Sequence, residues 1–309
     1  MGVLALLWGS VFLWIKIALD GGLSPVQITV ARCALGAGVL YALTARKRQR
    51  LPRGREVWRH LVIAAFFCNA MPFWLFSVGE QTVDSGIAGV VHATTPLWSV
   101  AIAYALGTER GLRPVHLGGL LIGFVGTIVI FAPWGQHGLT SWGSVALLGG
   151  AASYAVAFAY MKLHLTGRDS PLAISAAQLI AATGLSSLAL PFDGLQSFDA
   201  SATGLLAVIV LGTFATGVTF YLSYRIIEDE GPTAAATVSY LLPVVALALG
   251  AIVLGEVLDT RVVAGMLVVL IGVGMTRSRL ARHEDDAAES TTRVPPDARA
   301  GRRLATPAR

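Results

Sequence analysis

Long apolar stretches follow one another along most of the chain, and short polar segments separate them. Each stretch approaches the length of about 20 residues that a helix needs to cross a bilayer. The stretches are continuous rather than alternating, which argues against the strands of a membrane barrel. The pattern therefore predicts an all-α membrane protein with ten transmembrane helices, at residues 2–19, 26–45, 58–79, 85–106, 114–132, 142–163, 171–191, 202–222, 233–254 and 260–276.

The first half of the chain recurs in the second half at an offset of 146 or 147 residues. The corresponding residues in the two halves are Trp8 and Tyr154, Phe12 and Phe158, Trp14 and Tyr160, Lys16 and Lys162, Pro96 and Pro243, and Glu109 and Glu256. Duplicated halves with a binding site between them are typical of secondary transporters. We therefore expect two five-helix repeats, at residues 1–133 and 141–276, followed by a disordered cytoplasmic tail at residues 277–309.

Composition agrees with a bilayer environment. Hydrophobic residues make up 55% of the 309 residues and charged residues 13%, and the mean hydropathy is +0.68. Soluble domains carry about 25% charged residues. Cys33 and Cys68 both fall within predicted helices, so we interpret them as packing residues rather than a disulfide or a metal site. We expect no cofactor and no metal.

The basic residues indicate orientation rather than a nucleic-acid partner, although the pI is about 9.5. Seven Lys and Arg residues lie between Arg46 and Arg59 and eight follow Thr276, whereas the five alternate loops hold only Arg261. Segments rich in Lys and Arg face the cytoplasm. We therefore expect a multi-pass protein of the plasma membrane with both termini cytoplasmic. An odd number of helices in each repeat then inverts the second repeat relative to the first.

The first apolar stretch follows Met1 directly, without a basic leader or a small-residue cleavage site. We therefore expect it to be the first membrane helix rather than a cleaved signal peptide. Because this stretch is rather short, a start upstream of Met1 is also compatible with the pattern.

Several motifs resemble the EamA family of the drug/metabolite transporter superfamily. In the first half they are Trp8-Gly9, Pro25 with Arg32, and Pro96 with Glu109 and Gly118. The resemblance covers residues 1–276 and implies a ten-helix carrier of two inverted repeats that exports amino acids or other small metabolites. The second half departs from the pattern, with Gln178 in place of Arg32 and Tyr154-Ala155 in place of Trp8-Gly9.

Ionisable side chains within predicted helices are functional candidates, because lipid disfavours charge. Lys16 lies close to the outer surface, where snorkelling to the interface accounts for it. Arg32 lies about 10 Å below that surface, and it either pairs with Glu80 or Asp84 or attracts an anionic group of a substrate. His92 is either a hydrogen-bonded packing residue or a pathway group that titrates near neutral pH.

Pro96 and Pro243 occupy equivalent positions in the fourth and ninth predicted helices. Proline removes a backbone donor and frees a carbonyl one turn earlier, and paired helix breaks point to a transporter's binding site. The prolines either form part of that site or only bend the helices around it. We expect aromatic and polar side chains from both halves to line the cavity: Trp8, Asn69, Phe73, His92, Thr95, Tyr154, Phe158, Phe220, Tyr221, Ser239 and Tyr240.

These features predict a secondary transporter that works by alternating access, and the resemblance to the EamA family implies that it exports a small metabolite, such as an amino acid. A multidrug or organic-cation exporter is the alternative. An intramembrane serine hydrolase is the rival of another class, but only Gly184-Leu185-Ser186 resembles its motif, so we expect no enzyme. The expected partners are a small-molecule substrate and lipid. Gly119-x-x-x-Gly123 also permits a homodimer.

Energy coupling has no obvious carrier in the sequence. Glu80, Glu109 and Glu256 all fall near the ends of predicted helices. Either His92 supplies a titrating group, or transport is a facilitated flow down the gradient of the solute. The sequence favours facilitated flow.

Overall fold

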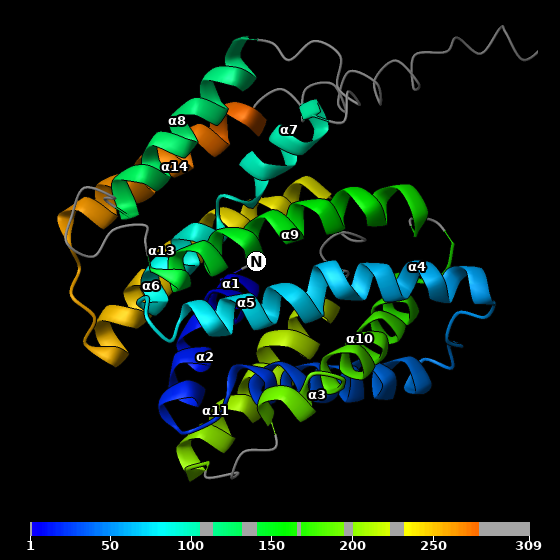
Figure 1. Cartoon of the computed structure of the whole chain (residues 1–309). Helices are drawn as coiled ribbons and strands as arrows, with labels where there is room; N and C mark the ends of the chain where they lie inside the picture. Colours follow the sequence, from blue (N-terminus) through cyan, green and yellow to red (C-terminus); the bar gives the residue numbers. More distant parts are fainter. Residues whose placement is uncertain are drawn as a thin grey trace, which may run out of the picture.

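The computed structural model describes residues 2–105, 114–131, 141–165, 168–194, 200–222 and 232–277 (Figure 1). Within these ranges every regular element is helical. The first half contains α1 (Gly2–Gly9), α2 (Val11–Asp20), α3 (Pro25–Arg46), α4 (Arg55–Ala65), the π turn η1 (Phe66–Ala70), α5 (Met71–Gly79), α6 (Ser85–His92), α7 (Thr95–Ala105) and α8 (Pro114–Phe131). The second half contains α9 (Trp142–His164), α10 (Pro171–Ser187), the π turn η2 (Leu190–Gly194), α11 (Ala202–Gly212), the π turn η3 (Thr213–Val218), α13 (Pro232–Leu254) and α14 (Thr260–Arg277).

Six helical segments of the described ranges are long and apolar enough to cross a membrane. They are Gly2–Asp20, Pro25–Arg46, Arg55–Gly79, Trp142–Met161, Pro171–Phe192 and Ala202–Leu222. Shorter apolar helices cover Leu121–Ile130, Leu241–Leu254 and Thr260–Met275. The predicted all-α membrane protein is thus confirmed, while the count of ten spans stays a prediction.

Two helices begin with the same Ser-Pro pair at equivalent positions of the two halves. Ser24 Oγ accepts a 3.2 Å hydrogen bond from the backbone N–H of Gln27, and Gln27 Oε1 accepts one of 3.0 Å in return from the backbone N–H of Ser24. Ser170 Oγ accepts a 3.3 Å hydrogen bond from the backbone N–H of Ala173. Serine at the cap satisfies a free N–H, and the proline that follows has no N–H to satisfy. These pairs fix where α3 and α10 start.

The helices of the two halves interleave instead of forming separate bundles. The most extensive contacts join α8 with α14, α3 with α10, α6 with α13, α5 with α9, and α2 with α11. Each of these pairs takes one helix from either half. A pocket at the centre of such an arrangement receives side chains from both halves.

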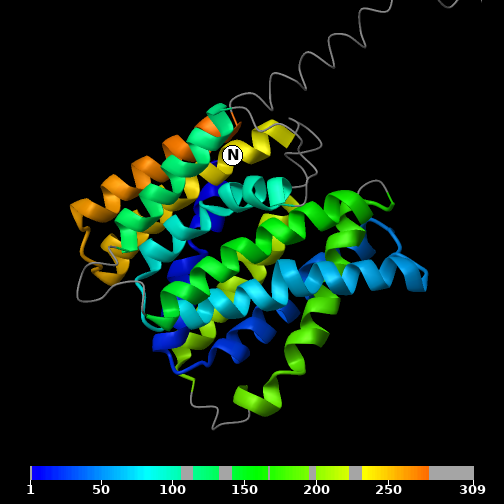
Figure 2. The same ribbon diagram turned by 45° about the horizontal axis from the view of Figure 1, so that its top comes forward.

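Glycines allow α8 and α14 to approach closely, and both views show the two helices side by side (Figures 1 and 2). A side chain at Gly272 of α14 would meet the backbone of Gly119 and Gly123 in α8. Small residues permit such contacts between membrane helices. The Gly119-x-x-x-Gly123 ridge therefore packs against α14 of the same chain, which accounts for it without a second copy.

The two equivalent prolines have different effects. The fourth predicted helix is divided, because α6 ends at His92 and α7 begins at Thr95. Pro96 lies in the first turn of α7, a position at which proline is common, and it offers no N–H to the carbonyl of His92 four residues earlier. At Pro243 the expected break is not present, since α13 continues through this residue. The neighbouring Leu242 is buried, and packing on that face holds α13 together despite one lost hydrogen bond.

Two of the π turns lie at equivalent positions of the repeat. η1 begins at Phe66 and η3 begins at Thr213, which is 147 residues later. A π turn widens the helix locally and is frequent at functional sites. Nothing in the hydropathy pattern predicts these turns, and one of them, η3, contains Thr216, which contacts Arg32 of α3.

Candidate functional site

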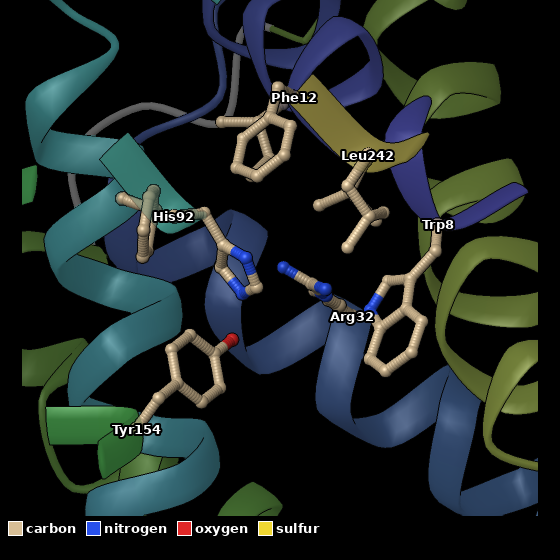
Figure 3. A pocket seen from close by; sticks show the side chains of 9 residues that line it. Trp8, Phe12, Arg32, His92, Tyr154 and Leu242 are labelled. Atoms are coloured by element: carbon tan, nitrogen blue, oxygen red, sulfur yellow. The ribbon is translucent and has the colours of Figure 1, made fainter. Parts of the chain in front are cut away.

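A small pocket lies at the centre of the helices, and Figure 3 shows the side chains that converge on it. Its wall consists of Trp8, Val11, Phe12, Ile15, Arg32, Phe76, His92, Tyr154 and Leu242. The cavity that these side chains enclose has a volume of about 20 Å³, which is enough for one or two water molecules. An organic solute would enter only after the surrounding helices move apart.

Arg32 on α3 places its guanidinium into this pocket (Figure 3). The residue is only 4% exposed. Its Nε donates a 2.8 Å hydrogen bond to Thr216 Oγ1, and its Cζ lies 3.6 Å from the ring centroid of Phe73. The Thr216 hydroxyl in turn donates to the carbonyl of Leu211 at 2.9 Å, so its oxygen is free to accept from Arg32.

Neither Glu80 nor Asp84, the two expected partners, forms an ion pair with Arg32 in the part of the chain described. No other carboxylate there lies within ion-pair distance of the guanidinium. A buried cation without a counter-charge is costly. The pocket therefore offers a positive charge that an anionic group of a ligand would neutralise.

His92, the last residue of α6, forms the aromatic side of the pocket. Its ring centroid lies 5.9 Å from that of Phe12, 5.6 Å from that of Phe76 and 5.1 Å from that of Tyr154. Among the described residues its ring nitrogens form no hydrogen bond. The imidazole, the Tyr154 hydroxyl and the Arg32 guanidinium all point toward the pocket centre (Figure 3). These three groups provide both donors and acceptors to a solute.

The carbonyl that Pro96 leaves without a backbone donor is that of His92. Thr95 Oγ1 donates a 2.7 Å hydrogen bond to this oxygen. The threonine hydroxyl therefore replaces the missing N–H at the break between α6 and α7. Thr95 stabilises the backbone below His92, and it does not line the pocket.

Asn69 lies outside the pocket wall and takes part in a second buried polar contact. Gln178 Nε2 on α10 donates a 2.7 Å hydrogen bond to Asn69 Oδ1 in η1. Gln178 is the repeat equivalent of Arg32, and Asn69 is the repeat equivalent of Thr216. Each half thus inserts one polar side chain into the π turn of the other half. Only the first half uses a charged residue for this contact.

Other expected lining residues lie elsewhere. Phe220 and Tyr221 pack against a separate cluster that contains Leu40 and Leu179. Phe158 stacks on Tyr154 at 6.0 Å but is 48% exposed. The side chains of Ser239 and Tyr240 lie outside the described residues.

Lys16 also lies away from the pocket. Its Nζ donates a 3.1 Å hydrogen bond to the backbone carbonyl of Glu80 and lies 4.0 Å from Asp20 Oδ1. These contacts tie α2 to the end of α5, while the expected snorkelling of Lys16 to the interface stays a prediction.

The sequence interpretation missed Phe76, Leu242 and the apolar face of α2 as lining residues. Phe76 follows Phe73 by three residues, and helical spacing places the two side chains on neighbouring faces. Leu242 directly precedes Pro243. The aromatic repeat did mark Phe12, one turn after Trp8, but only as a repeat position. Helical spacing from the chosen residues would have pointed to Phe12 and Phe76.

Several known proteins are similar to this chain in sequence. A sequence model described as the EamA-like transporter family matches residues 1–132 and 141–278. An "uncharacterized transporter" of Archaeoglobus fulgidus is 27% identical over 269 residues, which cover 86% of this chain and 93% of the relative. The "uncharacterized inner membrane transporter YedA" of Escherichia coli is 28% identical over 265 residues, which cover 83% of this chain and 82% of the relative.

Two further similarities extend over most of the chain. Protein PagO of Salmonella typhimurium is 25% identical over 280 residues, which cover 89% of this chain and 90% of the relative. One crystal structure of another protein matches with a TM-score of 0.65 at 21% identity, over 91% of this chain and 96% of the other. At that identity the structural match establishes a shared fold.

Proposed function

Because the chain belongs to the EamA-like transporter family, we propose that it moves a small organic solute across the plasma membrane by alternating access. The observation that carries this proposal is the central pocket. It receives side chains from both halves and contains the guanidinium of Arg32 without a carboxylate partner among the described residues. A binding site at the interface of two repeats is the usual arrangement in secondary transporters.

The proposed architecture has ten membrane helices in two inverted five-helix repeats, with both termini in the cytoplasm. Three observations support it. Basic residues alternate between loops, the π turns η1 and η3 occur at equivalent positions, and the principal helix pairs all join one half to the other.

The proposed solute is a neutral or anionic metabolite of the size of an amino acid. A carboxylate on the solute would neutralise Arg32 and accept two of its N–H groups. The apolar part would rest against Phe12, Phe76 and Tyr154, whose rings surround His92. A multivalent organic cation would meet the positive charge of Arg32 within low dielectric, which is unfavourable.

In the proposed cycle the compact pocket is the closed intermediate, and the solute leaves toward the outside. The chain is divided at Ser10, between α1 and α2, and at Thr94, between α6 and α7. Both divisions flank the pocket, since Trp8, Phe12 and His92 line it. Short helices joined at such points move more easily than one continuous helix, so we propose these divisions as hinges.

The test is a flux assay on the purified protein in liposomes. We expect the protein to accelerate the flux of at least one amino acid in a panel. Trp8→Ala and His92→Ala should slow that flux severalfold, and Arg32→Gln should affect carboxylate-bearing solutes most. Phe192→Ala is the matched control, because it also removes an aromatic ring but at a residue that is 88% exposed.

The same panel contains organic cations. The proposal would be contradicted by rapid flux of organic cations alone that the Trp8, His92 and Arg32 substitutions leave unchanged. That result would support a multidrug exporter, in which the aromatic rings of the lining bind the cations.

A further inference from the structure

Glu80 is a buried carboxylate whose oxygens have no partner. It follows α5 directly, at the end of the molecule where α2 finishes and α6 starts (Figure 1). The residue is 0% exposed. Neither Oε1 nor Oε2 accepts or donates a hydrogen bond within the described residues. Its backbone, by contrast, is paired, since the N–H donates to the carbonyl of Phe76 at 2.9 Å.

The nearest cation does not neutralise this carboxylate. Lys16 Nζ binds the backbone carbonyl of Glu80 and lies within 4.0 Å of Asp20, but it forms no ion pair with the Glu80 side chain. An ionised carboxylate in a site without donors loses several kcal/mol of hydration. The side chain avoids this loss if it holds a proton, which makes it neutral.

Three charged groups act on Glu80. They are Lys16 on α2, Arg32 on α3 and Glu256 in the loop between α13 and α14. Asp84, in the turn before α6, interacts with the same Lys16 and Glu256. Burial, and after it the carboxylate of Glu256, raises the pKa of Glu80 well above its usual value, while Lys16 and Arg32 act in the opposite direction. The attractive charges are thus outweighed by the loss of water.

The turn that holds Glu80 connects two walls of the pocket. The preceding α5 contributes Phe76 and the following α6 contributes His92. If α2, α5 and α6 separate at this end, the same motion opens the pocket and admits water to Glu80. Hydration would return the carboxyl to its usual acidity.

We propose that Glu80 is a proton-binding site at the outer end of the transporter, which takes up one proton from the outer solution when that end closes. On closing, a proton from outer water joins a carboxylate oxygen. On opening, the O–H bond breaks and the proton returns to outer water. The inference rests on the proposed function for its orientation and for the opening motion.

The sign of the pH dependence follows from the proton count. The closed state binds the proton and the open state does not, so raising the outer pH above the ordinary range of a carboxyl favours the open state. The ratio of open to closed molecules rises by up to about tenfold per pH unit for one proton. This dependence ends once the pH exceeds the raised pKa of the closed state.

Cysteine labelling measures the opening without any solute. Ser85 is buried at this end and its Oγ has no partner among the described residues, so Ser85→Cys, with Cys33→Ala and Cys68→Ala, provides the reporter. As the pH rises, a water-soluble maleimide should label this cysteine faster, and the increase should exceed that expected from the intrinsic reactivity of a thiol. Glu80→Gln should remove the additional dependence, because the amide binds no proton, whereas Asp84→Asn should keep it.

The proposal would be overturned if the labelling rate of the Ser85→Cys reporter depended on pH in the same way in the protein with Glu80 and in the protein with Glu80→Gln. Infrared spectroscopy of the unsubstituted protein gives a second measurement that needs no variant. The carbonyl band of a protonated carboxyl should be present at neutral pH, and its absence would equally overturn the proposal. Neither measurement uses a solute. Failure of every solute in the flux panel therefore counts against the proposed function alone, and a pH dependence that Glu80→Gln leaves unchanged counts against the proton site at Glu80 alone.

Discussion

Glu256 Oε1 accepts a 2.7 Å hydrogen bond from the backbone N–H of Ser85, which ties the loop between α13 and α14 to the first turn of α6. The second carboxylate oxygen accepts a 3.0 Å hydrogen bond from the backbone N–H of Gly86. A negative charge at a helix start is also favoured by the helix dipole. A residue of the second half thus supplies the cap of the helix that carries His92.

Glu256→Ala should destabilise the protein, because two N–H groups lose their acceptor. We expect a loss of about 1–3 kcal/mol in the free energy of unfolding, seen as a lower midpoint of thermal unfolding in detergent. Glu256→Gln keeps one acceptor oxygen, so its midpoint should lie between those of the original protein and of Glu256→Ala. Asp84→Asn is the control at the same turn, since the Asp84 side chain forms no capping hydrogen bond. Equal midpoints for Glu256→Ala and the control would show that the contact contributes nothing.

Thr216→Val should leave the Nε of Arg32 unpaired at nearly constant volume. The expected cost is about 1–3 kcal/mol in the free energy of unfolding, together with slower flux, because the guanidinium loses the contact that fixes its direction. Thr216→Ser retains the hydroxyl and should restore both properties. Thermal unfolding and flux are measured on the same preparations. A Thr216→Val protein as stable and active as the original would refute the positioning role.

Gly272→Ala should weaken the contact between α8 and α14. The added Cβ would meet the backbone of Gly123 and the carbonyl of Gly119, and backbone cannot yield as a side chain can. Overpacking of this kind costs about 1–3 kcal/mol. Gly274→Ala is the matched control on the same helix, because a Cβ there meets no atom within 4 Å. Thermal unfolding of the two variants should differ, and a shared midpoint would contradict the close packing.

Reporter fusions test the orientation. A fusion at Arg50, which follows α3, should report the cytoplasm, and a fusion at Gly135, outside the described residues, should report the opposite side, because basic residues gather around Arg50. A periplasmic phosphatase and a cytoplasmic fluorescent protein give complementary signals at each site. Signals that place both fusions on the same side of the membrane would overturn the inverted-repeat proposal.

Part of the site was predictable because the repeat and the helical period are properties of the sequence. Trp8, Arg32, His92 and Tyr154 were expected near the cavity, and all four line the pocket. Arg32 stood out because a charged residue in an apolar helix needs a polar surrounding. Its actual partner, Thr216, is 184 residues away in sequence, and no local pattern connects the two.

The rest depended on how helices rotate about their axes when they pack. Phe220 and Tyr221 follow the π turn η3, and they face a cluster between α3 and α10 instead of the pocket. Glu80 lies at a helix end, as expected, yet it is fully buried because neighbouring elements cover that end. Pro243 leaves α13 continuous because its effect depends on the surrounding packing.

The π turn η1 gives a single-residue deletion an unusual consequence. A π turn holds one residue more than the α-helical path requires, and each residue turns an α-helix by about 100°. Deletion of one residue within Phe66–Ala70 would therefore remove the bulge and let α4 and α5 join as a regular helix, with both helices in their present orientation. Deletion of one residue within α5 itself has no bulge to absorb it, and it would rotate the residues on one side of the gap by that angle. The π turn is thus a place where a descendant can lose one codon and still keep Phe73 beside Arg32 and Phe76 in the pocket.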